Sequence, residues 1–134
     1  MMKQGYLKLG ILALCFSISA IAQKSDSALP NGITIRSTTA GQVLADARGM
    51  TLYTFDKDMP DKSVCYDRCA TLWPPLVAKE GTNAPANWSM TTRTDGSKQW
   101  AYKGKPLYTF AEDTKPGDVA GNGYYGDMWH VAKN

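Results

Sequence analysis

Residues 52–58 read Leu-Tyr-Thr-Phe-Asp-Lys-Asp, and the pattern returns at residues 107–113 as Leu-Tyr-Thr-Phe-Ala-Glu-Asp. A glycine precedes each copy by the same interval, at Gly49 and at Gly104. Such a repeat indicates one supersecondary unit that occurs twice, with each copy burying its apolar face against its neighbour. The frame Tyr-x-Phe-x-x-Asp is filled by Tyr53, Phe55 and Asp58 in the first copy and by Tyr108, Phe110 and Asp113 in the second.

Short runs of alternating apolar and polar residues predict strands around both copies. Asp95-Gly96 lies between two such runs and is a strong hairpin signal. The sequence therefore predicts a mainly β, antiparallel domain over residues 33–134, built of two repeats at about 33–78 and 88–134. The expected strands cover 33–38, 43–45, 50–55, 88–93, 98–102, 106–110 and a closing strand that follows Tyr124-Tyr125 and spans 128–132.

One short helix is expected in this domain, at about residues 63–72. Cys65, Cys69 and Trp73 follow one another at intervals of four, so a helix places them on one face. Pro74-Pro75 ends it, because proline lacks the amide hydrogen that a helix interior needs. We expect this helix end to dock Trp73 against the sheet.

The chain has three cysteines, and one of them, Cys15, lies in the N-terminal segment. If that segment is removed on export, Cys65 and Cys69 remain as an even pair in an oxidising compartment, which predicts a disulfide. Residues four apart in a regular helix have Cα atoms about 6 Å apart, near the upper end of the usual range. We favour a structural bond over a redox-active one.

The first 22 residues have the features of a signal peptide. Lys3 and Lys8 give a basic start, residues 9–21 are almost wholly apolar, and Ala20-Ile21-Ala22 is a cleavage signal. The apolar run is shorter than the roughly 20 residues of a membrane span. We expect cleavage after Ala22, a periplasmic or secreted product, and a flexible segment at 23–32. Lipid attachment at Cys15 is the alternative.

The net charge of the chain gives no support for some classes of partner. The chain has 15 Lys and Arg against 12 Asp and Glu, and loss of Lys3 and Lys8 leaves 13 against 12, or +1. A chain that is almost neutral and has no basic run offers no electrostatic reason to expect nucleic acid or an anionic membrane surface as a partner.

The repeat motif itself allows two interpretations. In a strand, Tyr53 and Phe55 share one face, as do Tyr108 and Phe110. These rings then form either a core between the repeats, with each buried hydroxyl needing a partner, or a paired ligand site. In the first interpretation Asp58 and Asp113 form turns by accepting hydrogen bonds from amides two residues on. We favour the core.

Catalytic and metal-binding patterns are weak. The single histidine, His130, has no nucleophile beside it in sequence, and its expected role is a hydrogen-bonded strand residue. Asp56, Asp58 and Asp61 suggest a calcium site, but the second copy has Ala111 in place of Asp56. We expect no metal, no cofactor and no enzymatic activity.

The motifs together resemble a family of small exported bacterial proteins and lipoproteins described as secreted repeats with a Tyr-x4-Asp motif. The resemblance rests on both Tyr-x-Phe-x-x-Asp copies, Cys65-x3-Cys69-x3-Trp73-Pro74-Pro75-Leu76, Asp95 to Trp100 and Trp129-His130-Val131. It implies export and repeat structure without implying an activity. The sequence thus predicts a non-enzymatic envelope protein that binds a partner protein or small ligand. The alternative is a redox, metal- or haem-handling protein using Cys65 and Cys69, with His130 as a further ligand.

Overall fold

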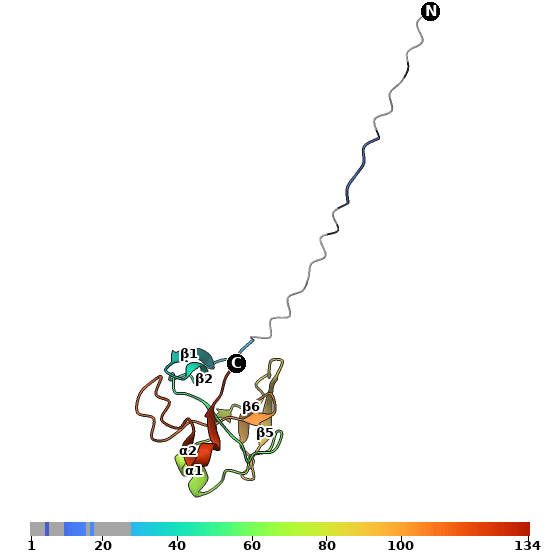
Figure 1. Cartoon of the computed structure of the whole chain (residues 1–134). Helices are drawn as coiled ribbons and strands as arrows, with labels where there is room; N and C mark the ends of the chain where they lie inside the picture. Colours follow the sequence, from blue (N-terminus) through green and yellow to red (C-terminus); the bar gives the residue numbers. More distant parts are fainter. Residues whose placement is uncertain (1–4, 6–9, 16, 18–27) are drawn as a thin grey trace, which may run out of the picture.

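The computed structural model describes residue 5, residues 10–15, residue 17 and residues 28–134 (Figure 1). The predicted cleavage position after Ala22 and residues 23–27 of the predicted flexible segment lie outside the described residues. Within the described part, no helix has both the length and the apolar character needed to cross a membrane.

The described domain is mainly β, as the sequence predicts, and all of its paired strands are antiparallel. Its elements, in chain order, are β1 (Thr34–Thr38), β2 (Gly41–Ala45), β3 (Tyr53–Phe55), α1 (Arg68–Leu72), β4 (Val77–Ala78), β5 (Trp88–Thr92), β6 (Lys98–Tyr102), β7 (Lys105–Pro106), α2 (Tyr124–Asp127) and β8 (Trp129–Val131).

Each repeat begins with a hairpin that leads into its copy of the motif. β1 pairs with β2 from Thr34 opposite Ala45 to Thr38 opposite Gly41. β5 pairs with β6 in the same way, around the predicted turn at Asp95-Gly96. A tight turn then follows each hairpin, with Gly49 at φ +81° before the first motif and Gly104 at φ +77° before the second.

The last strand of each repeat completes the sheet of the other repeat. β4, from the first repeat, pairs with β6 of the second, and β8, at the end of the second repeat, pairs with β3 of the first. Backbone hydrogen bonds repeat this exchange: Leu44 donates to the carbonyl of Ala132 at 2.8 Å, and Trp100 donates to that of Leu76 at 2.9 Å. Such reciprocal contacts are those of a two-fold arrangement, here within one chain.

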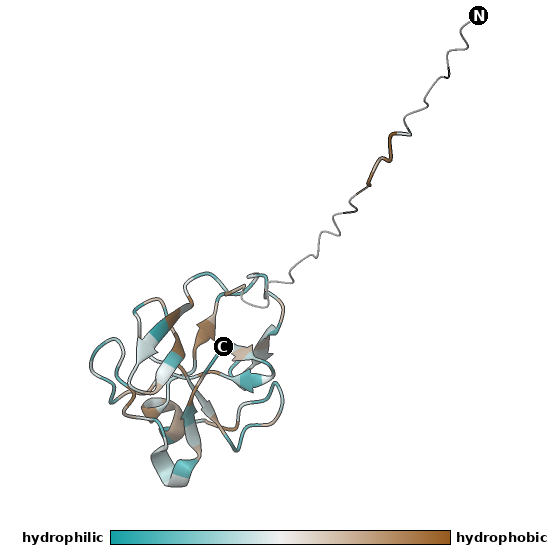
Figure 2. Ribbon diagram, turned by 45° about the horizontal axis from the view of Figure 1, so that its top comes forward, coloured by the Kyte–Doolittle hydropathy of each residue, from teal (hydrophilic) through white to brown (hydrophobic). Residues whose placement is uncertain are grey.

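The two motif segments meet at the centre of this arrangement. The amide of Tyr53 donates to the carbonyl of Tyr108 at 2.8 Å, and the amide of Tyr108 donates back to Tyr53 at 3.0 Å. Leu52 and Leu107 face one core cluster, with Leu44, Trp88 and Trp100, while the tyrosines face a second. Figure 2 shows hydrophobic patches on several strands and hydrophilic stretches along many of the loops around them.

The helices differ from the prediction in two respects. α1 begins at Arg68 rather than near Ser63, because Asp67 has a left-handed φ of +55° and the Cys65 carbonyl accepts a hydrogen bond from Arg93. A second helix was not expected: Tyr124-Tyr125 belongs to α2 rather than to the approach to the closing strand, because Gly123 and Gly126, both at positive φ, turn the chain there.

The strand expected at 106–110 is also shorter in the structure. β7 covers only Lys105–Pro106, and Tyr108 beyond it forms isolated bridges to Tyr53 and Pro75. The neighbouring segment contains Pro74 and Pro75, which have no amide hydrogen to donate, so a regular ladder cannot extend along it.

Candidate functional site

The frame that the two motifs share forms a pair of crossed hydrogen bonds. The hydroxyl of Tyr53 donates to Oδ2 of Asp113 at 2.6 Å, and the hydroxyl of Tyr108 donates to Oδ2 of Asp58 at 2.6 Å. Each tyrosine therefore binds the aspartate of the other motif. Both tyrosine side chains are fully buried, so these bonds supply the partners that buried hydroxyls require.

The aspartates organise longer loops than the sequence predicts. Oδ1 of Asp58 accepts from the amide of Val64 at 2.8 Å, and Oδ1 of Asp113 accepts from the amide of Ala120 at 3.0 Å. These amides lie six and seven residues on, so the expectation of a bond two residues on is wrong. A main-chain hydrogen bond closes the tight turn at the end of each motif instead. The amide of each aspartate donates to the carbonyl of the motif phenylalanine at 3.1 Å.

Burial and hydrogen bonding change the acidity of these groups. Burial raises the pKa of Tyr53 and of Tyr108 well above its usual range, and the hydrogen bond of each ring to a carboxylate adds to the effect. Burial also raises the pKa of Asp58 and of Asp113, while the bond from the tyrosine opposes that rise. The proton of each pair therefore stays on the phenol.

Four aromatic rings form one continuous stack across the junction of the repeats. Phe55 stacks on Trp129 with centroids 4.2 Å apart, and Phe110 stacks on Trp73 at 4.3 Å. The two tryptophans stack on each other at 3.8 Å with an interplanar angle of 1°. Each phenylalanine thus covers the tryptophan of the other repeat, in the same crossed manner as the tyrosines and aspartates.

The segments that lead to the two tryptophans occupy corresponding places in the two repeats, residues 65–73 matching residues 121–129. Their backbones differ in detail, because Tyr125, Gly126 and Asp127 have positive φ whereas the matching residues of α1 are helical. Asp67 and Gly123 each precede a short helix with positive φ, at 55° and 77°. The carbonyls near the ends of these segments accept corresponding hydrogen bonds. The amide of Ala111 donates to the carbonyl of Leu72 at 2.8 Å, and the amide of Asp56 donates to that of Met128 at 2.9 Å. By this match Cys65 corresponds to Gly121, Arg68 to Tyr124, and Cys69 to Tyr125.

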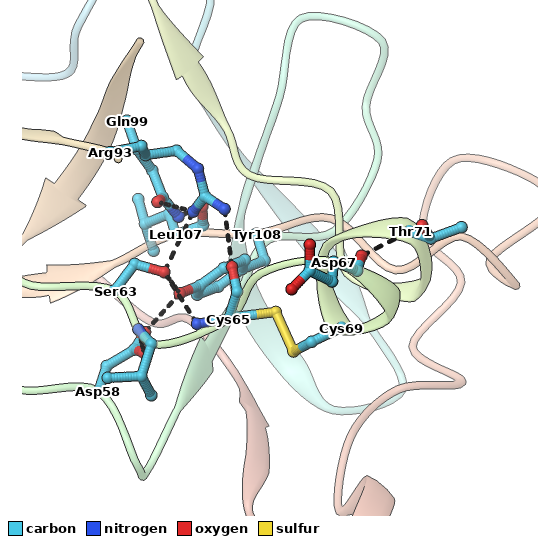
Figure 3. The surroundings of a disulfide bond; sticks show 11 residues. Asp58, Ser63, Cys65, Asp67, Cys69, Thr71, Arg93, Gln99, Leu107 and Tyr108 are labelled. Atoms are coloured by element: carbon cyan, nitrogen blue, oxygen red, sulfur yellow. Dashed lines mark hydrogen bonds between the residues drawn. A yellow bond between two sulfur atoms is a disulfide. The ribbon is translucent and has the colours of Figure 1, made fainter. Parts of the chain in front are cut away.

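The predicted disulfide between Cys65 and Cys69 is confirmed, with Cα atoms 5.2 Å apart (Figure 3). Cys65 is fully buried, whereas Cys69 is half-buried. The Cα separation is shorter than that of a regular helix because Cys65 lies before the start of α1 and only Cys69 is helical.

Arg93 holds the segment next to this disulfide. This buried guanidinium donates to Oγ of Ser63 at 3.1 Å, to Oε1 of Gln99 at 2.7 Å and to the carbonyl of Cys65 at 2.7 Å (Figure 3). Ser63 lies 2.6 Å from the hydroxyl of Tyr108, which gives its own hydrogen to Asp58, so Ser63 is the donor in that contact. A chain of polar contacts thus joins the disulfide segment to one tyrosine.

A groove of about 740 Å³ lies where the two repeats meet. We call it the junction groove. α1 and α2 flank it and lie side by side in Figure 1. Its lining is mostly apolar and comes from Phe55, Lys57, Val64, Arg68, Cys69, Leu72, Trp73, Tyr124, Tyr125 and Trp129. The stacked tryptophans, each 2% exposed, lie beneath it as a rigid floor.

The remaining sequence candidates lie apart from this groove. His130 Nε2 contacts Oδ2 of Asp56 at 2.9 Å on the half-exposed face of β8. Asp58 binds Tyr108, and Asp61 accepts from Ser89 at 2.5 Å, so the three aspartates of the calcium hypothesis serve different partners. Among the described residues, no three His, Cys, Asp or Glu side chains group as metal ligands would.

The sequence analysis did not predict the junction groove or the two basic side chains that line it, Lys57 and Arg68. One signal was present: Val64, Tyr124 and Tyr125 are large hydrophobic residues in otherwise polar loops. Their common position depends on how the two repeats pack, which the pattern of one repeat does not contain. Trp73 was expected to dock against the sheet, and in the structure it stacks on Trp129 and Phe110.

The sequence of this protein matches a family described as a secreted repeat of unknown function, over residues 34–77 and again over residues 89–133. The chain belongs to this family. The matched segments are the two repeats that exchange strands, each running from its first hairpin to its closing strand. Neither the curated proteins nor the solved structures include a match to the chain.

Proposed function

We propose that this secreted repeat protein binds a small molecule in the junction groove and has no catalytic role. The observation that carries the proposal is the concentration of exposed apolar side chains there. Val64, Tyr124 and Tyr125 are 44%, 38% and 68% exposed, and all three line the groove. Exposed apolar surface that gathers in one concave place is typical of a binding site.

The surroundings of the groove favour binding without rearrangement. Its floor is the tryptophan stack, fixed from both sides by Phe55 and Phe110. One wall is α1, which the disulfide and the hydrogen bond from Arg93 to the Cys65 carbonyl hold in place. A site whose walls are already ordered loses less conformational entropy on binding, which improves affinity.

The redox and metal-handling alternative lacks comparable support. The disulfide joins two residues of one turn, and its buried member, Cys65, packs into the aromatic core. His130 pairs with Asp56 and does not line the groove that Cys69 borders. We therefore assign the disulfide a structural role, which is to hold the α1 wall.

Native mass spectrometry of protein recovered undenatured from the producing cells tests the proposal. We expect a bound small molecule whose mass is released on denaturation. The double variant Val64→Ser and Tyr125→Ser, which removes apolar contacts from the groove, should lose it. Val77→Ser is the matched control, because Val77 is 63% exposed on β4 and outside the groove. A wild type without a bound molecule, or equal occupancy in both variants, contradicts the proposal.

A further inference from the structure

We propose that the ligand of the junction groove is a planar aromatic anion, a small ring compound carrying a carboxylate, sulfonate or similar group. This inference rests on the proposed function and names the chemical class of the ligand. Three features of the groove support it: the charge of its lining, the kind of apolar side chains, and the difference between its two walls.

The lining of the groove is cationic in a domain that is nearly neutral. Two of the ten lining residues, Lys57 and Arg68, are basic, and none is acidic. Both side chains are exposed, and neither forms a salt bridge within the described part of the chain. Asp56, the neighbour of Lys57, contacts His130 on β8 and does not line the groove. An anionic group at the rim therefore finds two cationic side chains that are not paired with a carboxylate in the described part of the chain.

The apolar part of the lining is mainly aromatic. Five of the ten lining residues carry rings: Phe55, Trp73, Tyr124, Tyr125 and Trp129. Tyr124 already packs against Phe110 and Trp73, with centroid distances of 5.2 and 5.8 Å, while Tyr125 is the most exposed of the five. Offset or edge contacts with such rings favour a flat aromatic body over a flexible chain.

The two walls present unlike chemistry at equivalent positions. Arg68 and Cys69 on α1 correspond to Tyr124 and Tyr125 on α2, and Lys57 corresponds to Glu112, which does not line the groove. The cations thus lie on the wall of the first repeat and the tyrosines on the wall of the second. A ligand with a charged end and a ring end matches this division, and the planar fork of Arg68 suits an oxyanion.

The test compares two fluorescent probes with the same ring system, anilinonaphthalene sulfonate and the uncharged phenylnaphthylamine. We expect the sulfonate to bind wild type more tightly, and its affinity to fall when salt is raised from about 0.02 to about 0.5 M, while that of the neutral probe does not fall. The double variant Lys57→Gln and Arg68→Gln should weaken binding of the sulfonate by about five- to tenfold and leave the neutral probe unchanged.

Two further variants make each outcome decisive. Lys79→Gln with Lys133→Gln removes the same charge at exposed positions outside the groove and should change neither affinity. Tyr125→Ser should weaken both probes. Suppose that both probes bind and that Tyr125→Ser weakens both, but that the groove and control lysine or arginine variants change the affinity for the sulfonate equally. The anion preference is then refuted, and the groove remains a binding site. If neither probe binds at the groove, both this inference and the proposed function are overturned.

Discussion

The two repeats of this chain agree in their core and differ at the junction groove. At the core, Leu52 and Leu107 match, as do the motif tyrosines, and the stacked tryptophans also match. At the groove, the first repeat has Arg68 where the second has Tyr124, and it has the disulfide residue Cys69 where the second has Tyr125. Each core residue contacts the equivalent region of the other copy, so a change in one repeat alters a contact that the other also needs. Arg68 and Tyr125 are exposed on the walls and take no part in the aromatic stack, so these positions can differ between the repeats and one wall can specialise.

The largest expected effect concerns the crossed tyrosines. Tyr53→Ala and Tyr108→Ala should each lower the free energy of unfolding by about 3–5 kcal/mol, because both rings are fully buried. Equilibrium denaturation of the two variants measures this. Similar losses would support equivalent roles, whereas a near-neutral result for either would show that the two repeats are not energetically alike.

The second prediction concerns alkaline pH. The folded-state pKa of each buried tyrosine lies above its unfolded value of about 10, so the stabilisation is complete below that pH and is lost as pH rises above it. Each tyrosine should contribute a fall of about 1.4 kcal/mol per pH unit in the free energy of unfolding.

Phenylalanine substitutions separate this effect from other alkaline titrations. Tyr53→Phe and Tyr108→Phe should each reduce the slope, and the exposed Tyr125→Phe is the control that should not. A slope that is unchanged in both core variants would contradict a role for these two tyrosines in the alkaline loss of stability.

The third prediction asks what the first repeat gains from its disulfide. Replacing Cys65 and Cys69 by serine should cost about 2 kcal/mol of unfolding free energy, because the closed loop is short. Intact-mass analysis with thiol alkylation, before and after reduction, checks the bond in wild type. Free thiols in freshly secreted protein would contradict a structural role, and so would a double variant of unchanged stability.

The fourth prediction uses Gly121, the position equivalent to Cys65. A Cβ atom there would lie 2.6 Å from the ring of Trp73, although the backbone φ is ordinary. Gly121→Ala should therefore destabilise by about 1–2 kcal/mol through overpacking. Adding Trp73→Phe removes the ring atoms nearest to the new methyl group. A double-mutant cycle should show coupling between the two changes, and strict additivity would locate the cost elsewhere.

The smallest expected effect is a gain. Asp67 has a φ of +55° where the second repeat has Gly123, and an L-residue pays for that conformation. Asp67→Gly should raise the free energy of unfolding by about 0.5–1 kcal/mol, measured by denaturation. A loss of stability would indicate that the Asp67 side chain has a role that the backbone comparison does not reveal.

Local patterns predicted the hairpins, the two repeats and the disulfide, because these depend on residues close together in sequence. The crossing of Tyr53 to Asp113 could not be predicted, since pairing within one repeat would satisfy the same pattern. The start of α1 was misplaced because the conformation of Asp67 depends on the turn that the disulfide spans and on Arg93, far along the chain. The groove was missed for a related reason: its walls come from both repeats.

The exchange of closing strands also fixes the order in which the protein can complete its fold. Ala132, at the end of the second repeat, donates to Leu52 and accepts from Leu44, so the first hairpin lacks these partners until the second repeat has been made. A chain that leaves the ribosome from its N-terminus therefore cannot complete the contacts of the first repeat before the second repeat is present. Contacts so distant in sequence form late and slowly. The two repeats therefore complete their folding together rather than one after the other.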